Sequence, residues 1–212
     1  MGKEYNYSVA IEPYEPAEDE TISDLGPLER EIWKLDGKLH NHRGPAVIIR
    51  QIETGRVVQE EFFERGRRHR EIGPAFIVRN DFDEERQWYL EDQLHRKGGP
   101  AIEVECLFNQ IRTQEVWIEE GKIHRKCAPA RICRDDATGD EISIEYFEDG
   151  QLHRIDGGPA LIEADPNMAG AIVRYEWYRD GALFREGGQP TKVYFDYALK
   201  RFQTEDLNPT PD

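Results

Sequence analysis

The sequence predicts an all-β fold, an elongated antiparallel β-hairpin repeat array of about six units arranged as a meander or solenoid. Three observations predict it: a motif that returns at nearly constant spacing, Asp-Gly dipeptides between apolar flanks, and no helical periodicity of useful length. A unit of this size cannot bury its own apolar residues, so neighbouring units must cover one another. The repeat therefore decides the architecture.

The repeat is defined by an aromatic residue that precedes a histidine by seven positions, with a Pro-Ala pair after the histidine. The histidine position falls at residues 40, 69, 95, 124, 153 and 184, at intervals of 29, 26, 29, 29 and 31 residues. The sixth unit is altered, with Phe184 in place of histidine and Thr191 in place of alanine. The aromatic residues are Trp33, Phe62, Trp88, Trp117, Tyr146 and Trp177. Such regular spacing identifies a structural repeat.

Each unit contains the signals of two turns. Asp-Gly dipeptides, as at Asp36-Gly37, are the strongest short hairpin signal, and Asp92-Gln93 departs from it, which predicts a strained or longer turn there. Runs rich in β-branched residues follow Pro-Ala, and a second turn follows each run, as at Thr54-Gly55. Each unit is thus predicted as strand, turn, strand, tight turn and a short His-Arg return.

The ends of the chain differ from the repeats. Residues 1–31 form an acidic N-terminal segment, with nine acidic against two basic residues, an added strand near residues 5–11, a mobile loop at 15–24 and the remnant of a capping unit at Gly26-Pro27. Residues 32–203 form the β-hairpin repeat domain, which one short turn at 197–202 closes. Residues 204–212 are predicted as a disordered acidic tail.

Charge and composition bound the function classes. The 212 residues carry a net charge of −15, which argues against direct binding to nucleic acid because phosphate contacts need an excess of Lys and Arg. No apolar stretch reaches the length of a membrane span and no signal peptide is recognisable, so we expect a cytoplasmic protein without membrane contact. Cys106, Cys127 and Cys133 are expected as reduced thiols. A zinc site that combines them with His124 is the alternative, but no paired CxxC supports it.

The pattern aromatic-x-x-x-Gly-x-x-His-Arg-x-x-Gly-Pro-Ala resembles MORN-type repeats and their longer variants in bacterial and phage proteins. The resemblance runs from about Ile32 to Val193. Standard MORN units are shorter, and the His-Arg and Gly-Pro-Ala elements are not their hallmark. The resemblance implies a hairpin rod used for protein or lipid contact, with an antitoxin or immunity role in some bacterial relatives. It implies no catalytic residues.

The repeated polar positions have a structural and a functional interpretation. We expect each histidine to bond through one ring nitrogen to a neighbouring turn, the alternative being acid–base or metal chemistry. The arginines that follow are expected to pair with strand carboxylates such as Glu60, Glu61, Glu103 and Glu145, the alternative being a groove for phosphate or carboxylate groups. The repeat aromatics are expected to form the spine of the core. The arginines are Arg70, Arg96, Arg125, Arg154 and Arg185.

The variable turns carry apolar residues that the repeat does not require. Phe82, Leu107 and Phe108 are candidate anchors for a partner, with Asp83 beside the first of them, because binding residues accumulate at loop tips on a rigid scaffold. The acidic run Glu18-Asp19-Glu20 is a second candidate contact. No catalytic, cofactor or metal residue is predicted.

The sequence therefore favours a non-enzymatic protein-binding repeat module, an inhibitor of another protein of the antitoxin, immunity or phage anti-defence type. Its expected partner is a bacterial enzyme or toxin, and self-association through open sheet edges is an open possibility. Two alternatives remain: an acidic nucleic-acid mimic that blocks a nuclease or DNA-binding protein, and a hydrolase, nuclease or metal protein that uses the His-Arg positions.

Overall fold

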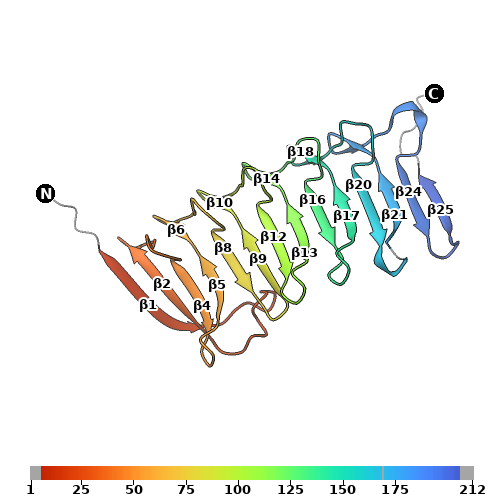
Figure 1. The fold of residues 1–212 in the computed structure, drawn as a ribbon. Helices are drawn as coiled ribbons and strands as arrows, with labels where there is room; N and C mark the ends of the chain where they lie inside the picture. Colours follow the sequence, from red (N-terminus) through yellow and green to blue (C-terminus); the bar gives the residue numbers. More distant parts are fainter. Residues whose placement is uncertain (1–5, 169, 206–212) are drawn as a thin grey trace. The chain divides into compact units, whose positions relative to one another are not determined.

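The computed structural model describes residues 6–168 and 170–205, which form two compact units. Unit 1 takes residues 6–96 and 101–110, and unit 2 takes residues 97–100, 111–168 and 170–205. Both units consist of antiparallel β-hairpins, and the described part of unit 2 adds two 3-10 turns, Pro166–Met168 and Glu186–Gly188. The predicted all-β hairpin fold is confirmed (Figure 1).

The long strands of unit 1 form one antiparallel sheet in the order β1-β2-β4-β5-β8-β9-β12, so each pairs with the next long strand along the chain. They are β1 (Tyr7–Tyr14), β2 (Leu28–Leu35), β4 (Val47–Gln51), β5 (Val57–Glu61), β8 (Phe76–Arg79), β9 (Asp83–Gln87) and β12 (Ile102–Cys106). Short strands form the tight hairpins: β3 (Lys38–Leu39), β6 (Phe63–Glu64), β7 (Arg67–Arg68), β10 (Tyr89–Leu90) and β11 (Gln93–Leu94).

Unit 2 repeats this plan, with the sheet order β13-β16-β17-β20-β21-β24-β25. Its long strands are β13 (Arg112–Val116), β16 (Arg131–Arg134), β17 (Glu141–Glu145), β20 (Leu161–Asp165), β21 (Ala171–Glu176), β24 (Lys192–Asp196) and β25 (Arg201–Glu205). Its tight hairpins are made by β14 (Ile118–Glu119), β15 (Lys122–Ile123), β18 (Phe147–Glu148), β19 (Gln151–Leu152), β22 (Tyr178–Arg179) and β23 (Ala182–Leu183).

The tight hairpin turns have two residues in the left-handed region. In the first sequence repeat these are Asp36 (φ 50°) and Gly37 (φ 78°), the geometry of a type I′ turn. The turn of the third sequence repeat also has two residues, Glu91 (φ 49°) and Asp92 (φ 71°), and both lie in the left-handed region. The Asp92 carboxylate accepts a hydrogen bond from Arg68 N at 2.6 Å. The turn is therefore strained rather than longer. The hydrogen bond of the Asp92 side chain compensates for the missing glycine.

Backbone hydrogen bonds recur with the motif. The histidine N–H donates to the carbonyl of the aromatic residue seven positions earlier, as from His40 to Trp33 at 3.1 Å. The aromatic N–H donates to the alanine of Pro-Ala, as from Trp33 to Ala46 at 2.7 Å. Ala46 in turn donates to Glu61 of the next unit, also at 2.7 Å. This position is fully buried in several units, which explains its small residue: Ala46, Ala75, Ala101, Ala130 and Ala160.

The apolar core of unit 1 lies on one face of its sheet. It consists of Ile22, Leu28, Val47, Ile49, Val58 and Val78, with Tyr14, Phe63 and Phe76 packed against it. The three repeat aromatics of unit 1, Trp33, Phe62 and Trp88, do not belong to it and are only half-buried. The predicted aromatic spine is therefore wrong for unit 1, because these rings lie where the long strands give way to the tight hairpins.

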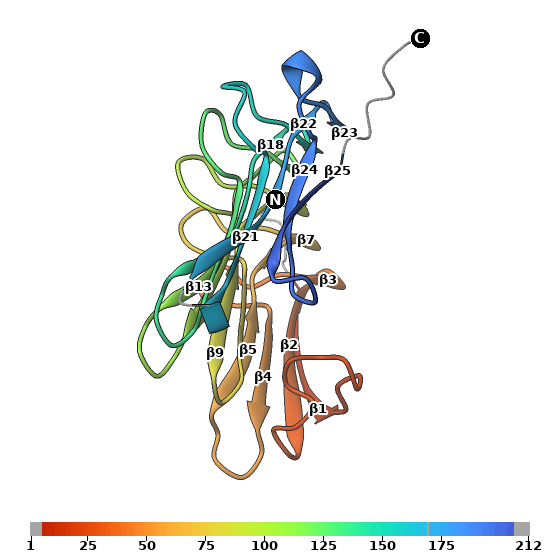
Figure 2. The same ribbon diagram turned by 90° about the vertical axis from the view of Figure 1, so that its right-hand side faces the viewer.

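The N-terminal segment is built into unit 1. The predicted added strand is β1, and the following residues 15–27 lie beside β1 and β2 (Figure 2). Ile22 is 1% exposed in the core, and the Tyr14 hydroxyl donates to both Glu20 oxygens at 3.1 and 2.9 Å. Burial and this bond raise the pKa of Tyr14 to about 12. Residues 15–24 are thus held against the sheet and are not the free loop that the sequence predicted.

The C-terminal expectations differ in part from the structure. Thr204 and Glu205 belong to β25, whereas residues 206–212 of the predicted tail lie outside the described residues. The predicted closing turn at 197–202 is the connection between β24 and β25, and β25 begins already at Arg201. Phe195 pairs with Phe202 across these strands, with ring centroids 5.4 Å apart.

Candidate protein-binding site

The repeated histidines are supports for the next hairpin. In four described pairs the imidazole Nδ1 accepts a hydrogen bond from a backbone N–H in the tight turn of the following unit. The pairs are His40–Arg65 and His69–Glu91 at 3.4 Å, and His124–Asp149 and His153–Asp180 at 3.1 Å. One ring nitrogen of each histidine is thus directed at the next hairpin turn. The structural interpretation of the histidines is confirmed for these four.

The arginines that follow the histidines stack on the repeat aromatics. The guanidinium carbon lies 3.7 to 4.1 Å from the ring centroid in the pairs Arg70–Phe62, Arg96–Trp88, Arg125–Trp117, Arg154–Tyr146 and Arg185–Trp177. Most also donate from Nη1 to the carbonyl of the following proline, as Arg125 does to Pro129 at 3.1 Å. In the first sequence repeat, Asn41 replaces the arginine and its side-chain amide donates to the Pro45 carbonyl at 3.0 Å.

The predicted pairing of these arginines with strand carboxylates is wrong for most of them. Only Arg96 binds one of the named carboxylates, Glu103, at 2.7 Å. The others are bound by arginines of the strands, in the pairs Glu60–Arg79, Glu61–Arg68 and Glu145–Arg131. The repeat arginines instead stack on the half-buried ring of their own unit, a favourable cation–π contact that does not depend on a carboxylate.

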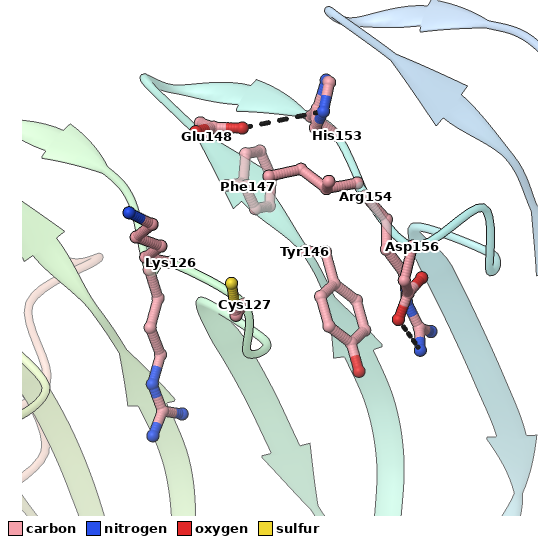
Figure 3. A pocket seen from close by; sticks show the side chains of 10 residues that line it. Lys126, Cys127, Tyr146, Phe147, Glu148, His153, Arg154 and Asp156 are labelled. Atoms are coloured by element: carbon pink, nitrogen blue, oxygen red, sulfur yellow. Dashed lines mark hydrogen bonds and ion pairs between the residues drawn. The ribbon is translucent and has the colours of Figure 1, made fainter.

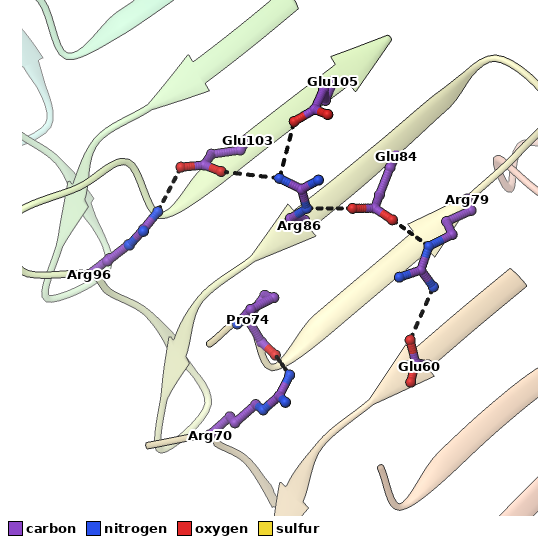
Figure 4. A network of polar contacts seen from close by, with 9 residues as sticks. All are labelled: Glu60, Arg70, Pro74, Arg79, Glu84, Arg86, Arg96, Glu103 and Glu105. Atoms are coloured by element: carbon purple, nitrogen blue, oxygen red, sulfur yellow. Dashed lines mark hydrogen bonds and ion pairs between the residues drawn. The ribbon is translucent and has the colours of Figure 1, made fainter. Parts of the chain in front are cut away.

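Glu60, Glu84, Glu103 and Glu105 form a network with strand arginines across the face of the unit 1 sheet opposite its core (Figure 4). Arg79 binds Glu60 at 3.0 Å and also binds Glu84. Arg86 binds Glu84 and, at 3.2 Å, Glu105. Partial burial alone would raise the pKa of Glu84, but hydrogen bonds from Arg86 and Arg79 outweigh it and lower that pKa below its ordinary value. This network holds the carboxylates of β5, β9 and β12 in internal pairs.

Every second connection of the unit 1 meander lies at the same end of its sheet. These connections are residues 15–27, 52–56, 80–82 and 107–110, and together we call them the turn ridge (Figure 1). Neighbouring members are hydrogen-bonded: Ile52 N donates to Pro27 O at 3.0 Å, and Leu107 N donates to Phe82 O at 2.7 Å. Arg56 joins the middle pair through Asp81 at 2.6 Å. The turn ridge is therefore a connected surface.

Two aromatic side chains stand exposed on the turn ridge. Phe82 is 63% exposed and Phe108 is 79% exposed, and their ring centroids lie 6.4 Å apart. The Asn80 carboxamide accepts hydrogen bonds from Phe82 N at 2.7 Å and Asp83 N at 2.6 Å, a side-chain turn that sets the direction of Phe82. Leu107 directly precedes Phe108, is 41% exposed, and donates its backbone N–H to the Phe82 carbonyl. The predicted anchors are thus brought together.

The predicted acidic contact residues differ in their exposure. Glu18 and Asp19 are exposed on the turn ridge, so the structure places them at the same end of the sheet as the aromatic anchors. Glu20 is half-buried and bonded to Tyr14 and to Ala17 N at 3.1 Å. Asp83 is also half-buried, at the start of β9. Glu18 and Asp19 therefore remain open for a partner, whereas Glu20 serves the fold.

Two members of the turn ridge were not among the sequence candidates. Ile52 is 54% exposed in the turn after β4, and Arg56 connects that turn to Asp81. The signal that could have found them is the alternation of an antiparallel meander, which sends every second connection to the same end.

The comparisons give no further guide to function. Neither a family model, nor a curated protein, nor a solved structure matches this chain.

A hollow lies in unit 2, between the returns of two consecutive hairpins (Figure 3). Cys127, Tyr146, Phe147 and Ile155 give it an apolar lining, and Arg154 at its edge is bonded to Asp156. Cys127 is exposed and has φ 58°. This hollow was not predicted from the sequence, and two pairs of its lining groups are engaged with one another, His153 with Glu148 at 3.6 Å and Arg154 with Asp156 at 2.7 Å.

Two further findings concern metal and membrane. In residues 6–168 and 170–205, no three His, Cys, Asp or Glu side chains gather in a way that could hold a metal ion. No helix among these residues has the length and apolar character needed to cross a bilayer.

Proposed function

We propose that this chain is a protein-binding module and that its turn ridge receives the partner. The observation that carries the proposal is the pair Phe82 and Phe108, exposed side by side on adjacent turns. Aromatic side chains that project from a surface supply much of the binding energy in protein interfaces. The functional interpretation accounts for two rings in water where the repeat requires neither.

Rigidity of the turn ridge supports the proposal. The Asn80 side chain accepts hydrogen bonds from the backbone N–H groups of Phe82 and Asp83. The backbone N–H of Leu107 in the next turn donates to the Phe82 carbonyl. A surface that is already ordered loses less conformational entropy on binding, so more of the contact energy appears as affinity. The turn ridge is suited to bind a folded surface without rearrangement.

The charges around the aromatic pair indicate the chemistry of the partner. Glu53 and Asp81 are exposed in the neighbouring turns, and Glu18 and Asp19 add carboxylates on residues 15–27. The one cation within the turn ridge, Arg56, is paired with Asp81. The fitting partner presents an apolar pocket with a basic rim.

An inhibitory role is the finer form of this proposal. Its support is the resemblance to MORN-type repeats, some bacterial relatives of which act as antitoxins or immunity proteins. The prediction is that the partner is an enzyme or toxin and loses activity when the turn ridge is bound. An activity assay of the captured partner, with and without this chain, tests that step separately from binding.

A site-specific crosslinking experiment tests the binding proposal. A photoreactive benzoylphenylalanine at position 82 is expected to capture one partner in stoichiometric yield in the native host. The same residue at position 72, where Ile72 is 84% exposed in a connection at the other end of the sheet, is the control. Equal capture from both positions, or none from position 82, would refute the turn ridge as the binding site.

A further inference from the structure

β1 is an open edge of the unit 1 sheet. It pairs with β2, and no strand among residues 6–168 and 170–205 pairs with its other side. Trp33 N donates to Ala46 O, so the odd-numbered residues of β2 bond to β4 and the even-numbered ones bond to β1. The bond from Asp36 N to Asn6 O, at 3.0 Å, follows the same pattern. The backbone groups of Tyr7, Val9 and Ile11 therefore point out of the sheet.

Pro13 agrees with this assignment. It occupies the next outward position, where a residue without an N–H removes no bond to β2. Tyr7, Val9 and Ile11 have their side chains on one face of the sheet, and they are 43%, 47% and 61% exposed. The edge thus presents both free backbone groups and apolar side chains.

This edge has little of the usual protection against pairing. Sheet edges are commonly guarded by lysine, by proline, by a bulge or by shortness, and of these β1 carries only Pro13, near its C-terminal end. β1 spans eight residues and pairs with β2 without a register shift, whereas the inner pair β4–β5 has a shift between Ile49 and Arg50. The one charged residue of β1, Glu12, is ion-paired with Arg30. A long and regular edge whose one charge is paired is suited to receive another strand.

We propose that the occupant is β1 of a second copy of this chain, paired antiparallel about a two-fold axis. With Val9 opposite Val9 of the second copy, Tyr7 lies opposite Ile11 and Glu12 lies opposite Asn6. All outward N–H and C=O groups of Tyr7, Val9 and Ile11 then find partners, and the position of Pro13 lies outside these pairs. No like charges meet in this register, and the two surfaces are the same patch, as a two-fold interface requires.

The test is the molar mass in solution across a concentration series, measured by sedimentation equilibrium on the full chain. The expected result is a rise from 24.7 kDa towards twice that value at high micromolar concentration. Val9→Pro removes an outward donor without touching the β1–β2 bonds, and Ile11→Lys adds the missing edge charge. Each is expected to weaken association at least tenfold, with the circular dichroism spectrum unchanged.

The matched control is Phe202→Lys, which places the same charge on β25 at a residue that is 52% exposed. Its association is expected to equal that of the wild type. A wild type that stays monomeric at every concentration overturns the proposal. So does a dimer that survives both β1 substitutions, or one that Phe202→Lys abolishes. If Val9→Pro disturbs the fold, Ile11→Lys decides alone.

Discussion

The guanidinium carbon of Arg125 lies 3.7 Å from the centroid of the Trp117 ring. The same arginine donates to the Pro129 carbonyl, so it links the aromatic residue of its unit to the Pro-Ala segment that begins the next strand. The same stacking recurs in other repeats along the chain. The arginines for which a phosphate or carboxylate groove was the alternative are therefore internal supports of the fold.

Removal of this support is expected to destabilise unit 2. Arg125→Ala loses a stacking contact and a hydrogen bond to a carbonyl, together about 1–2 kcal/mol of the free energy of unfolding. Arg125→Asn can restore the carbonyl bond, as Asn41 does in the first unit, and should fall between Ala and wild type. Urea unfolding measures the series. An asparagine variant no better than alanine would contradict the assigned role of the carbonyl bond.

The histidine at the repeat position is expected to contribute through its ring acceptor. His153→Ala leaves the Asp180 N–H without its 3.1 Å partner, and because Asp180 is exposed, water replaces part of the bond. The expected loss is about 0.5–1 kcal/mol, measured by urea unfolding. His153→Phe keeps the ring and removes the acceptor, so it should be no better than alanine. Full stability in the phenylalanine variant would assign the effect to packing instead.

Gln110 is a site for stabilisation. It has φ 61° in a turn where Gly55 and Gly139 hold the corresponding positions of other units. Gln110→Gly relieves about 1–2 kcal/mol of backbone strain, partly offset by the greater freedom of glycine in the unfolded chain. A net gain of about 0.5–1 kcal/mol is expected by thermal or urea unfolding. The reverse change, Gly139→Gln, should destabilise by a similar amount, and a loss in Gln110→Gly would contradict the account.

The Arg–Glu network predicts a dependence of stability on pH. Folding lowers the pKa of Glu84, so its contribution is fully present above the unfolded-state pKa of about 4.3 and is lost as the pH falls below it. Glu84→Gln should therefore be less stable than wild type at pH 7 and should lose less stability on acidification. Glu53→Gln, at an exposed residue of a turn, is the control. Parallel pH profiles for Glu84→Gln and wild type would refute this coupling.

Much of the fold could be predicted because its signals are local. Asp36-Gly37 specifies its turn through the left-handed conformations of two adjacent residues, and the runs after Pro-Ala specify strands through their side chains. The histidine bond could also be predicted, because the regular spacing places each ring beside the next turn. These features needed no knowledge of what covers the sheet.

The partners of the arginines could not be predicted in this way. Whether Arg70 meets Glu60 or Phe62 depends on how much of the ring stays open once the strands pack, which no local pattern reports. The burial of Ile22 is a similar case, because an acidic segment gives little sign that one apolar residue will complete a core.

The candidate site was predicted in pieces. Phe82 and Phe108 stood out singly as apolar residues in variable turns, but their proximity depends on bonds between turns of different hairpins, such as Arg56 to Asp81 across 25 positions. Those bonds become visible only when the turns are placed at one end of the sheet.

The affinity of the captured partner for defined variants tests the central claim most directly. Calorimetric titration of the wild type against Phe82→Ala/Phe108→Ala should show a loss of about 100-fold or more, since each ring is expected to act as an anchor. Ile72→Ala, at the other end of the unit 1 sheet, should bind within about twofold of wild type. A double variant that binds as tightly as wild type would contradict the proposal that the turn ridge is the binding site.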